Sequence, residues 1–420
     1  MKKHLKHLCV VSVMSVATIM PTSVFAQAST PIACPDYKRG TTNIPGQKVG
    51  KKVGKALEAY NNDLIDEALE LLYDIETSNK FDRAFTDRFI GNLLATQKGK
   101  AKKAIDYLQK AVAPNKLNDA EQVGTIKLIA DLSLQEEQYD SAIKYYQQWM
   151  KVTCKEDFDV YFRMTNAYYQ TQKYPEMIAP INKAIALAKK PNKTAYALKM
   201  TSYYNRKMYK ETIAVQEETV RIFPDDKGQW TQLGFFYMLV EDHKKALSTF
   251  EMAYNQGYLT KAAEIKALSQ LYAMNDIPLK AAEVLEKHIK SGLVKNEERM
   301  LTNVASSYQQ AKEFKEAAEY YGKSAAISSD PDLYQKQGMV LYALEKYSPA
   351  IVALQKALDG GSNKKGALHI AIMQANFDKG DFKSAYKHVL EAKKDRSTAR
   401  NARSWEPYIK EKAKNRGIKL

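Results

Sequence analysis

The chain has 420 residues, of which 45% are hydrophobic and 27% charged, and this balance excludes an intrinsically disordered protein. Its 13 prolines and 18 glycines are few for this length, which disfavours turn-rich all-β folds and collagen-like chains. The formal net charge is +16, and three of the excess lysines lie in the first six residues. We therefore expect a helical protein.

Residues 1–26 have the pattern of a secretory signal peptide. Three lysines precede an apolar run at residues 8–20, and a small-residue ending follows at Ala26. The alternative is a membrane anchor, but a span needs about 20 residues and this run is shorter. We expect cleavage after Ala26 and a periplasmic protein. No later stretch is apolar enough for stable membrane insertion.

Residues 27–44 are predicted to form an extended N-terminal segment that contains Cys34. The only other cysteine after the signal peptide is Cys154. In an oxidising compartment an isolated pair is a disulfide candidate, which would tie this segment to the end of the third repeat described below. The alternative is two unpaired thiols without a role.

An internal repeat is clearest at residues 230–253. It reads Trp230-x2-Leu233-Gly234-x2-Tyr237 and then Ala246-x3-Phe250-x2-Ala253. This pattern closely resembles the tetratricopeptide repeat (TPR), a helix-turn-helix unit of about 34 residues. The small Gly234 and Ala246 are expected to let the two helices approach, while the rings of Tyr237 and Phe250 fill the space around them.

The small residue represented by Ala246 marks a register through most of the chain. Its equivalents recur every 33 to 38 residues, at Ala68, Ala104, Ala142, Met177, Thr212, Ala246, Ala281, Ala317, Ala350 and Ala385. Four residues later stands an apolar or aromatic residue in every unit except the one with Gln216. Three residues earlier an aromatic residue is common, so we interpret most of the tyrosines as packing residues.

The repeats predict an all-α fold. We expect a right-handed superhelical TPR solenoid of about ten helix-turn-helix repeats at residues 45–395, with one long concave face. Residues 396–420 would form a basic C-terminal capping tail. Positive charge gathers at both ends: residues 383–420 hold 12 basic and 4 acidic side chains, which suits a polar cap or an acidic partner.

The sequence contains no pattern typical of catalysis or metal binding. It lacks a phosphate-binding loop, a nucleophile elbow and a cysteine cluster, and none of the histidines after residue 26 are spaced i, i+4. His369 and His388 lie in neighbouring predicted helices, where packing is favoured over a metal pair. We expect no enzyme, no cofactor and no metal site. Nucleic acid is disfavoured because no known binding module is present.

The resemblance to TPR proteins implies a groove lined by the first helix of each pair. Its fifth, ninth, twelfth and thirteenth positions would face a bound protein segment. Carried over to this chain, the groove residues are Phe162, Asn166, Tyr169, Gln170, Thr201, Tyr204, Asn205, Phe235, Met238, Gln270, Gln309, Gln310, Gln335, Tyr342, Gln374 and Phe377. Amides and aromatic rings dominate, which suits the peptide groups and apolar side chains of an extended segment.

A clamp for a partner's terminal carboxylate, known in some TPR proteins, is not expected. Lys127 is followed by Asp131, where that clamp would need asparagine. In the tail, Trp405 and Tyr408 are expected to lay the segment on the last helix pair. The alternative is that they anchor a partner.

Several short segments resemble one particular group of TPR proteins. Residues 399–417 (ARNARSWEPYIKEKAKNRG), together with LHIA at 368–371, QANF at 374–377 and VGKKV at 49–53, are similar to periplasmic TPR proteins associated with TonB systems of gammaproteobacteria. This similarity implies a non-catalytic scaffold that binds TonB-complex subunits in iron or haem uptake. The alternative is an envelope-assembly or secretion adaptor for other periplasmic or outer-membrane proteins.

Overall fold

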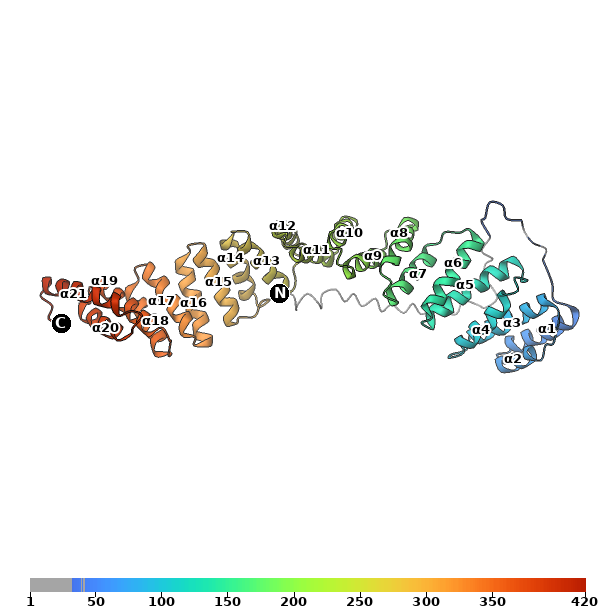
Figure 1. Cartoon of the computed structure of the whole chain (residues 1–420), viewed down its shortest axis with the longest axis horizontal. Coiled ribbons are helices and arrows are strands. Elements are labelled where there is room, and N and C mark those ends of the chain that lie inside the picture. Colours follow the sequence, from blue (N-terminus) through green and yellow to red (C-terminus); the bar gives the residue numbers. More distant parts are fainter. Residues whose placement is uncertain (1–31, 39, 41) are drawn as a thin grey trace. The chain divides into compact units, whose positions relative to one another are not determined.

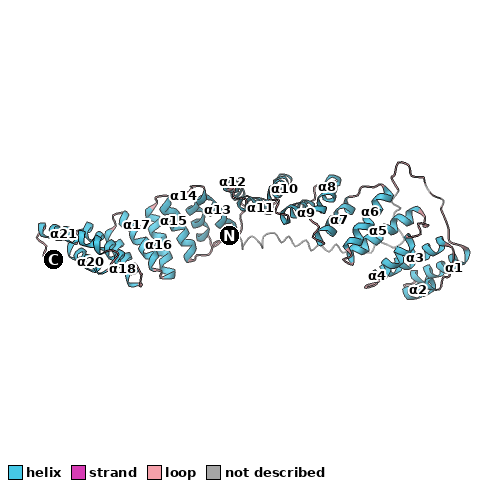
Figure 2. Cartoon of the chain, viewed as in Figure 1, coloured by secondary structure: helices cyan, strands magenta, loops and turns pink. Residues whose placement is uncertain are grey.

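The computed structural model describes residues 32–38, 40 and 42–420, so the predicted signal peptide lies outside the described residues. The described residues form 21 α-helices, one short 3-10 turn and no strand (Figure 1, Figure 2). The predicted all-α fold of TPR-type hairpins is thus confirmed. The described residues form two compact units, one up to residue 222 and one from residue 223 to 420, and we describe each by itself.

The N-terminal unit consists of five helical hairpins that pack in chain order. Its helices are α1 (Gln47–Asn61), α2 (Ile65–Tyr73), α3 (Lys80–Ala95), α4 (Ala101–Val112), α5 (Asp119–Gln135), α6 (Tyr139–Thr153), α7 (Phe158–Gln170), α8 (Ile178–Leu187), α9 (Lys193–Asn205) and α10 (Tyr209–Ile222). The 3-10 turn Pro175–Met177 leads into α8. Each hairpin therefore consists of an odd-numbered first helix and an even-numbered second helix.

The C-terminal unit has five more hairpins and one final helix. Its helices are α11 (Lys227–Leu239), α12 (His243–Asn255), α13 (Ala262–Met274), α14 (Pro278–Lys290), α15 (Glu298–Gln310), α16 (Phe314–Ser328), α17 (Pro331–Ala343), α18 (Tyr347–Asp359), α19 (Lys365–Lys379), α20 (Phe382–Lys394) and α21 (Ala399–Asn415). The last of these, α21, packs against α20 and has no partner helix of its own among the described residues.

One left-handed residue lies in the turn of every hairpin, five residues before the small-residue marker. These residues are Asp63, Gly99, Glu137, Gln172, Lys207, Glu241, Asp276, Lys312, Glu345 and Gly380. A positive φ is uncommon for residues other than glycine, so its recurrence at one register position is specific. The period therefore holds in all ten hairpins, including the two with the larger markers Met177 and Thr212.

Glycines let the two helices of a hairpin touch. A Cβ added to Gly91 would lie 2.5 Å from Leu108, and one added to Gly234 would lie 2.4 Å from the ring of Phe250. Leu108 and Phe250 are fully buried, and each lies four residues after the marker of its repeat. The packing role predicted for Gly234 and Phe250 is thereby confirmed.

The same substitution at two glycines of the N-terminal unit is expected to change stability in opposite directions. Gly91→Ala should lower the free energy of unfolding by about 1–3 kcal/mol, because the new methyl overlaps Leu108. Gly54→Ala in α1 should raise it by up to about 1 kcal/mol, because a Cβ there meets nothing within 4 Å and alanine favours the helix. Urea denaturation measures both, and equal effects would contradict the packing.

An N-terminal strap, the described residues between 32 and 46, runs past the starts of several helices in this unit. Its backbone N–H groups donate from Ala33 to Thr153 O (2.7 Å), from Gly40 to Asp119 Oδ2 (3.0 Å), from Asn43 to Asn118 Oδ1 (2.8 Å) and from Gly46 to Asp82 Oδ1 (3.0 Å). The Asn118 amide also donates to the carbonyl of Asn43. The strap therefore runs from the third hairpin past the second and continues into the first, in the direction opposite to their order.

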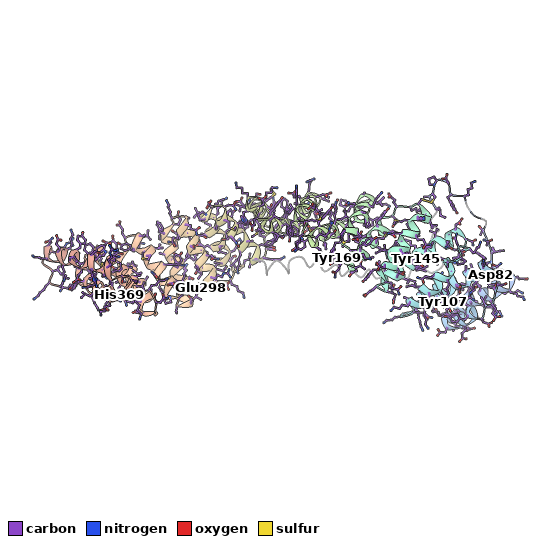
Figure 3. All side chains as sticks on the ribbon, in the orientation of Figure 1. Asp82, Tyr107, Tyr145, Tyr169, Glu298 and His369 are labelled. Atoms are coloured by element: carbon purple, nitrogen blue, oxygen red, sulfur yellow. A yellow bond between two sulfur atoms is a disulfide. The ribbon has the colours of Figure 1, made fainter. Side chains whose placement is uncertain are left out.

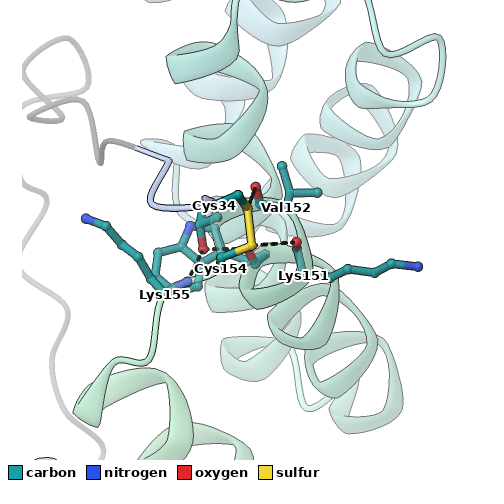
Figure 4. The surroundings of a disulfide bond; sticks show 7 residues. Cys34, Lys151, Val152, Cys154 and Lys155 are labelled. Carbon is teal, nitrogen blue, oxygen red and sulfur yellow. Dashed lines mark hydrogen bonds between the residues drawn. A yellow bond between two sulfur atoms is a disulfide. The ribbon is translucent and has the colours of Figure 1, made fainter. Parts of the chain in front are cut away.

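A disulfide fastens the far end of the strap. Cys34 and Cys154 are joined with their Cα atoms 4.9 Å apart, although 120 residues separate them in sequence (Figure 4). Cys154 follows α6 directly and has a left-handed backbone, with φ of 49°. The bond thus joins the strap to the turn between the third and fourth hairpins, as the sequence suggested.

Candidate functional site

Aromatic pairs orient the first-helix rings that were predicted to line a groove. Tyr169 and Tyr204 each contact a tyrosine five residues later, with ring centroids 6.5 Å and 6.0 Å apart. Tyr342 contacts Tyr347 in the same way, at 5.9 Å. The second ring of each pair is the residue that the register assigned to packing. The partner ring holds the first-helix ring in place and leaves it half-buried.

In the N-terminal unit the predicted groove residues lie on α7 and α9, two first helices that contact each other. Phe162 stacks on Phe158 with centroids 5.6 Å apart, and Tyr169 lies farther along α7 (Figure 3). The amide of Asn205 donates to the backbone carbonyl of Thr201. Asn205 and Gln170 are exposed, whereas Phe162, Asn166, Tyr169, Thr201 and Tyr204 are half-buried. These side chains form a wall of rings and amides.

In the C-terminal unit a hollow of about 410 Å³ brings two predicted residues together, Gln309 of α15 and Gln335 of α17. The rest of its lining comes from the start and middle of α17 and the start of α19: Asp330, Asp332, Leu333, Lys336, Met339 and Lys364. Leu333 is buried, and Met339 remains 46% exposed. The hollow therefore combines two carboxamides and four charged side chains with the apolar Leu333 and Met339.

Opposite charges balance one another around this hollow. Lys364 Nζ lies 3.0 Å from Asp332 Oδ1, and Asp330 accepts the N–H of Asp332 as the cap of α17. Lys336 lies over the ring of Tyr321. The hydroxyl of Tyr321 also donates to Gln309 Oε1 at 2.8 Å, which orients that amide. Two carboxylates and two ammonium groups thus leave the lining of this hollow with no net charge.

The sequence-based groove omitted Met339, which is nevertheless at the ninth position of its repeat. The same register rule that selected Gln335 and Tyr342 would have found it. Asp332 and Lys364 could not be found in that way, because they lie where helices begin. Their place at the hollow depends on how α17 and α19 pack together.

The other predicted groove residues of this unit do not line the hollow. Gln270 and Gln310 are exposed, Met238 and Gln374 are half-buried, and the ring of Phe235 packs edge-on against Phe250 at 5.1 Å. Tyr342 donates to Asp378 Oδ2 at 2.5 Å, so it links α17 to α19. Burial and this hydrogen bond raise the pKa of Tyr342 to about 12.

Phe377 is a packing residue rather than an open groove residue. Its ring lies 5.4 Å from Trp405, 5.1 Å from Tyr408 and 5.3 Å from Phe382. The tail thus lies on the last hairpin through the two aromatic residues expected to place it there. It forms the helix α21, which continues across Pro407.

A carboxylate clamp was not expected at Lys127, because Asp131 stands where the clamp would need asparagine. In the structure the carboxylate of Asp131 accepts a hydrogen bond from the buried Tyr146 at 2.5 Å. It also lies 3.5 Å from Lys127 Nζ and 3.4 Å from a guanidinium nitrogen of Arg163. These two cations are thus neutralised from within the chain.

His369 of α19 and His388 of α20 meet, as their positions suggested. Their Nδ1 atoms are 3.0 Å apart (His369 is labelled in Figure 3). Burial and the neighbouring His369 lower the pKa of His388 to about 4. Across the described residues no cluster of three or more His, Cys, Asp or Glu side chains is placed to hold a metal ion. Nor is any described helix long and apolar enough to cross a bilayer.

No protein-family model and no curated protein sequence matches the chain. Similar solved structures include the C-terminal part of a TPR repeat-containing protein from Cytophaga hutchinsonii (18% identity, 56% of this chain and 96% of that one, TM-score 0.37). Another is YrrB, described as a TPR protein with an unusual peptide-binding site (17% identity, 47% of this chain and 97% of that one, TM-score 0.35). A third is Naa15/Naa10 bound to HypK-THB (12% identity, 87% of this chain and 68% of that one, TM-score 0.45). These likenesses concern the fold, which the ten hairpins and their common turn establish within the chain itself. Solenoids of this kind are typically non-catalytic scaffolds for protein binding.

Proposed function

We propose that this protein is a non-catalytic scaffold whose C-terminal unit binds an extended protein segment. The hollow formed by Gln309, Gln335 and Met339 carries this proposal. A carboxamide donates and accepts hydrogen bonds at once, so two of them match the peptide groups of an extended chain. The flexible thioether of Met339 suits an apolar side chain from the same segment.

We propose further that the partner is a subunit of a TonB complex and that the protein acts in the periplasm. The similarity of residues 399–417 and of the shorter segments to TonB-associated TPR proteins supports the partner. The signal-like pattern of residues 1–26 and the Cys34–Cys154 disulfide support an oxidising compartment. An envelope-assembly or secretion adaptor is the alternative.

Placing a charge in the hollow is expected to abolish capture of the partner. Met339→Glu replaces the apolar thioether in the lining of the hollow by a carboxylate, so recovery of TonB-complex subunits from periplasmic extract should fall at least tenfold. Val352→Glu is the matched control, because Val352 lies on α18 of the same hairpin and is 57% exposed. Capture by the control should equal that of the wild type.

Two results would count against these proposals. If both variants lose capture of the partner equally, or both retain it equally, the hollow is not the binding site. Recovery of envelope-assembly proteins in place of TonB-complex subunits would support the adaptor. The partner would then change, while the hollow would still be tested by the same pair of variants.

A further inference from the structure

The final helix, α21, carries a row of exposed cations on one side. Residues 396–420 contain eight basic and two acidic side chains. On α21 four of the cations are Arg400, Arg403, Lys410 and Lys414, all of them exposed. Their spacings of 3, 7 and 4 residues keep them within a sector of about 80° on an α-helix. We refer to these four residues as the cationic row.

Most of this charge has no counter-charge in the described chain. Glu406 is shared between Lys393 and Lys410, whose Nζ atom lies 2.9 Å from the Glu406 carboxylate. Arg400, Arg403 and Lys414 form no ion pair with a described acidic side chain. Some other lysines of the same unit do have such partners, as Lys323 does in Glu319 and Lys394 in Glu391.

A second hollow, of about 490 Å³, begins where the cationic row ends. Lys410 and Lys414 belong to both, and Lys419, Tyr386 and Ile418 complete much of the lining. Lys410 Nζ also lies 5.3 Å from the ring centroid of Tyr386. The row and this hollow thus form one continuous cationic surface at the end of the unit.

We propose that this surface binds an acidic protein segment. Arginine recognises carboxylates through paired N–H groups, so Arg400 and Arg403 suit aspartate or glutamate side chains. The row spans about 21 Å, a length that about seven extended residues cover. This surface is separate from the hollow at Met339, so the proposal does not depend on the function proposed above.

The packing of α21 favours a protein segment over a lipid surface. An interfacial helix buries an apolar face in the bilayer. The apolar face of α21, formed by Ala402, Ile409 and Ala413, is fully buried in a core cluster shared with α20. Apart from Pro407 and the ring of Tyr408, the exposed side chains of α21 are charged or polar, and Trp405 is half-buried against Phe377. The helix therefore has no continuous apolar face left to insert.

The test measures how the full chain binds a fluorescent peptide of about eight glutamates, by anisotropy at low salt. Arg400→Glu with Arg403→Glu should weaken binding at least tenfold, and added salt should weaken the wild type further. The matched control is Lys189→Glu with Lys190→Glu, which changes the net charge equally in a loop of the other unit. The control should bind like the wild type, and a peptide of glutamines should not bind.

Equal loss in both double variants would show that binding follows net charge alone, and it would overturn the proposal. So would tighter binding to anionic phosphatidylglycerol vesicles or to a single-stranded oligonucleotide than to the peptide. Circular dichroism of the Arg400→Glu, Arg403→Glu variant should equal that of the wild type, because both side chains are exposed. Met339→Glu should leave peptide binding unchanged, which separates this surface from the hollow.

Discussion

Replacing Cys34 and Cys154 by serine is expected to lower the free energy of unfolding of the N-terminal unit by about 2–5 kcal/mol. The disulfide closes a loop of 120 residues, so its loss increases the conformational entropy of the unfolded chain. It also removes the covalent link at the end of the strap, which is then held by its hydrogen bonds to Thr153, Asp119, Asn118 and Asp82. Urea denaturation followed by circular dichroism measures the change.

The C-terminal unit provides the internal control, because it contains no cysteine. Its unfolding transition should keep its midpoint in the double variant, and reduction of the wild type should reproduce the shift of the N-terminal unit. A chain that begins at residue 27 should show no free thiol under denaturing, non-reducing conditions. Two free thiols, or an unchanged midpoint, would contradict a stabilising disulfide.

Trp149→Ala is expected to destabilise the N-terminal unit by about 3–5 kcal/mol. Trp149 of α6 is 2% exposed and is among the largest fully buried side chains described. Its removal leaves a cavity that rigid helices fill only in part. Tyr73→Ala in the same unit is the control, because Tyr73 is 48% exposed and its loss should cost about 1 kcal/mol or less. Similar losses for the two variants would mean that Trp149 is not enclosed.

The hairpins were predictable because local contacts decide them. The two helices of a hairpin are only a few residues apart in the chain. Their close packing requires a small residue at the position of Ala246 and a large one at the position of Phe250. The same rule located units whose markers are Met177 and Thr212. Thr212 is tolerated although it is buried, because its hydroxyl donates to the carbonyl of Met208 at 2.8 Å. Gln216, the exception at the large position, is also buried.

The strap and the hollow were less predictable because their contacts join distant residues. Nothing near Asn43 in the sequence indicates that its backbone pairs with Asn118, and no repeat position indicates that Lys364 reaches Asp332. The register gave the face of each first helix but not which side chains remain open there. Phe377 is the example, since α21 covers the residue that the register placed in the groove.

The strap also has a consequence for the order in which the protein folds. A helical hairpin can form as soon as it leaves the ribosome, because its contacts are local. The strap is synthesised before α1, yet Thr153 and Cys154, which hold its far end, follow 120 residues later. The N-terminal unit therefore has to keep its first segment unattached until the third hairpin is complete. Once attached, the strap joins three hairpins that would otherwise open one at a time, so we expect them to open together.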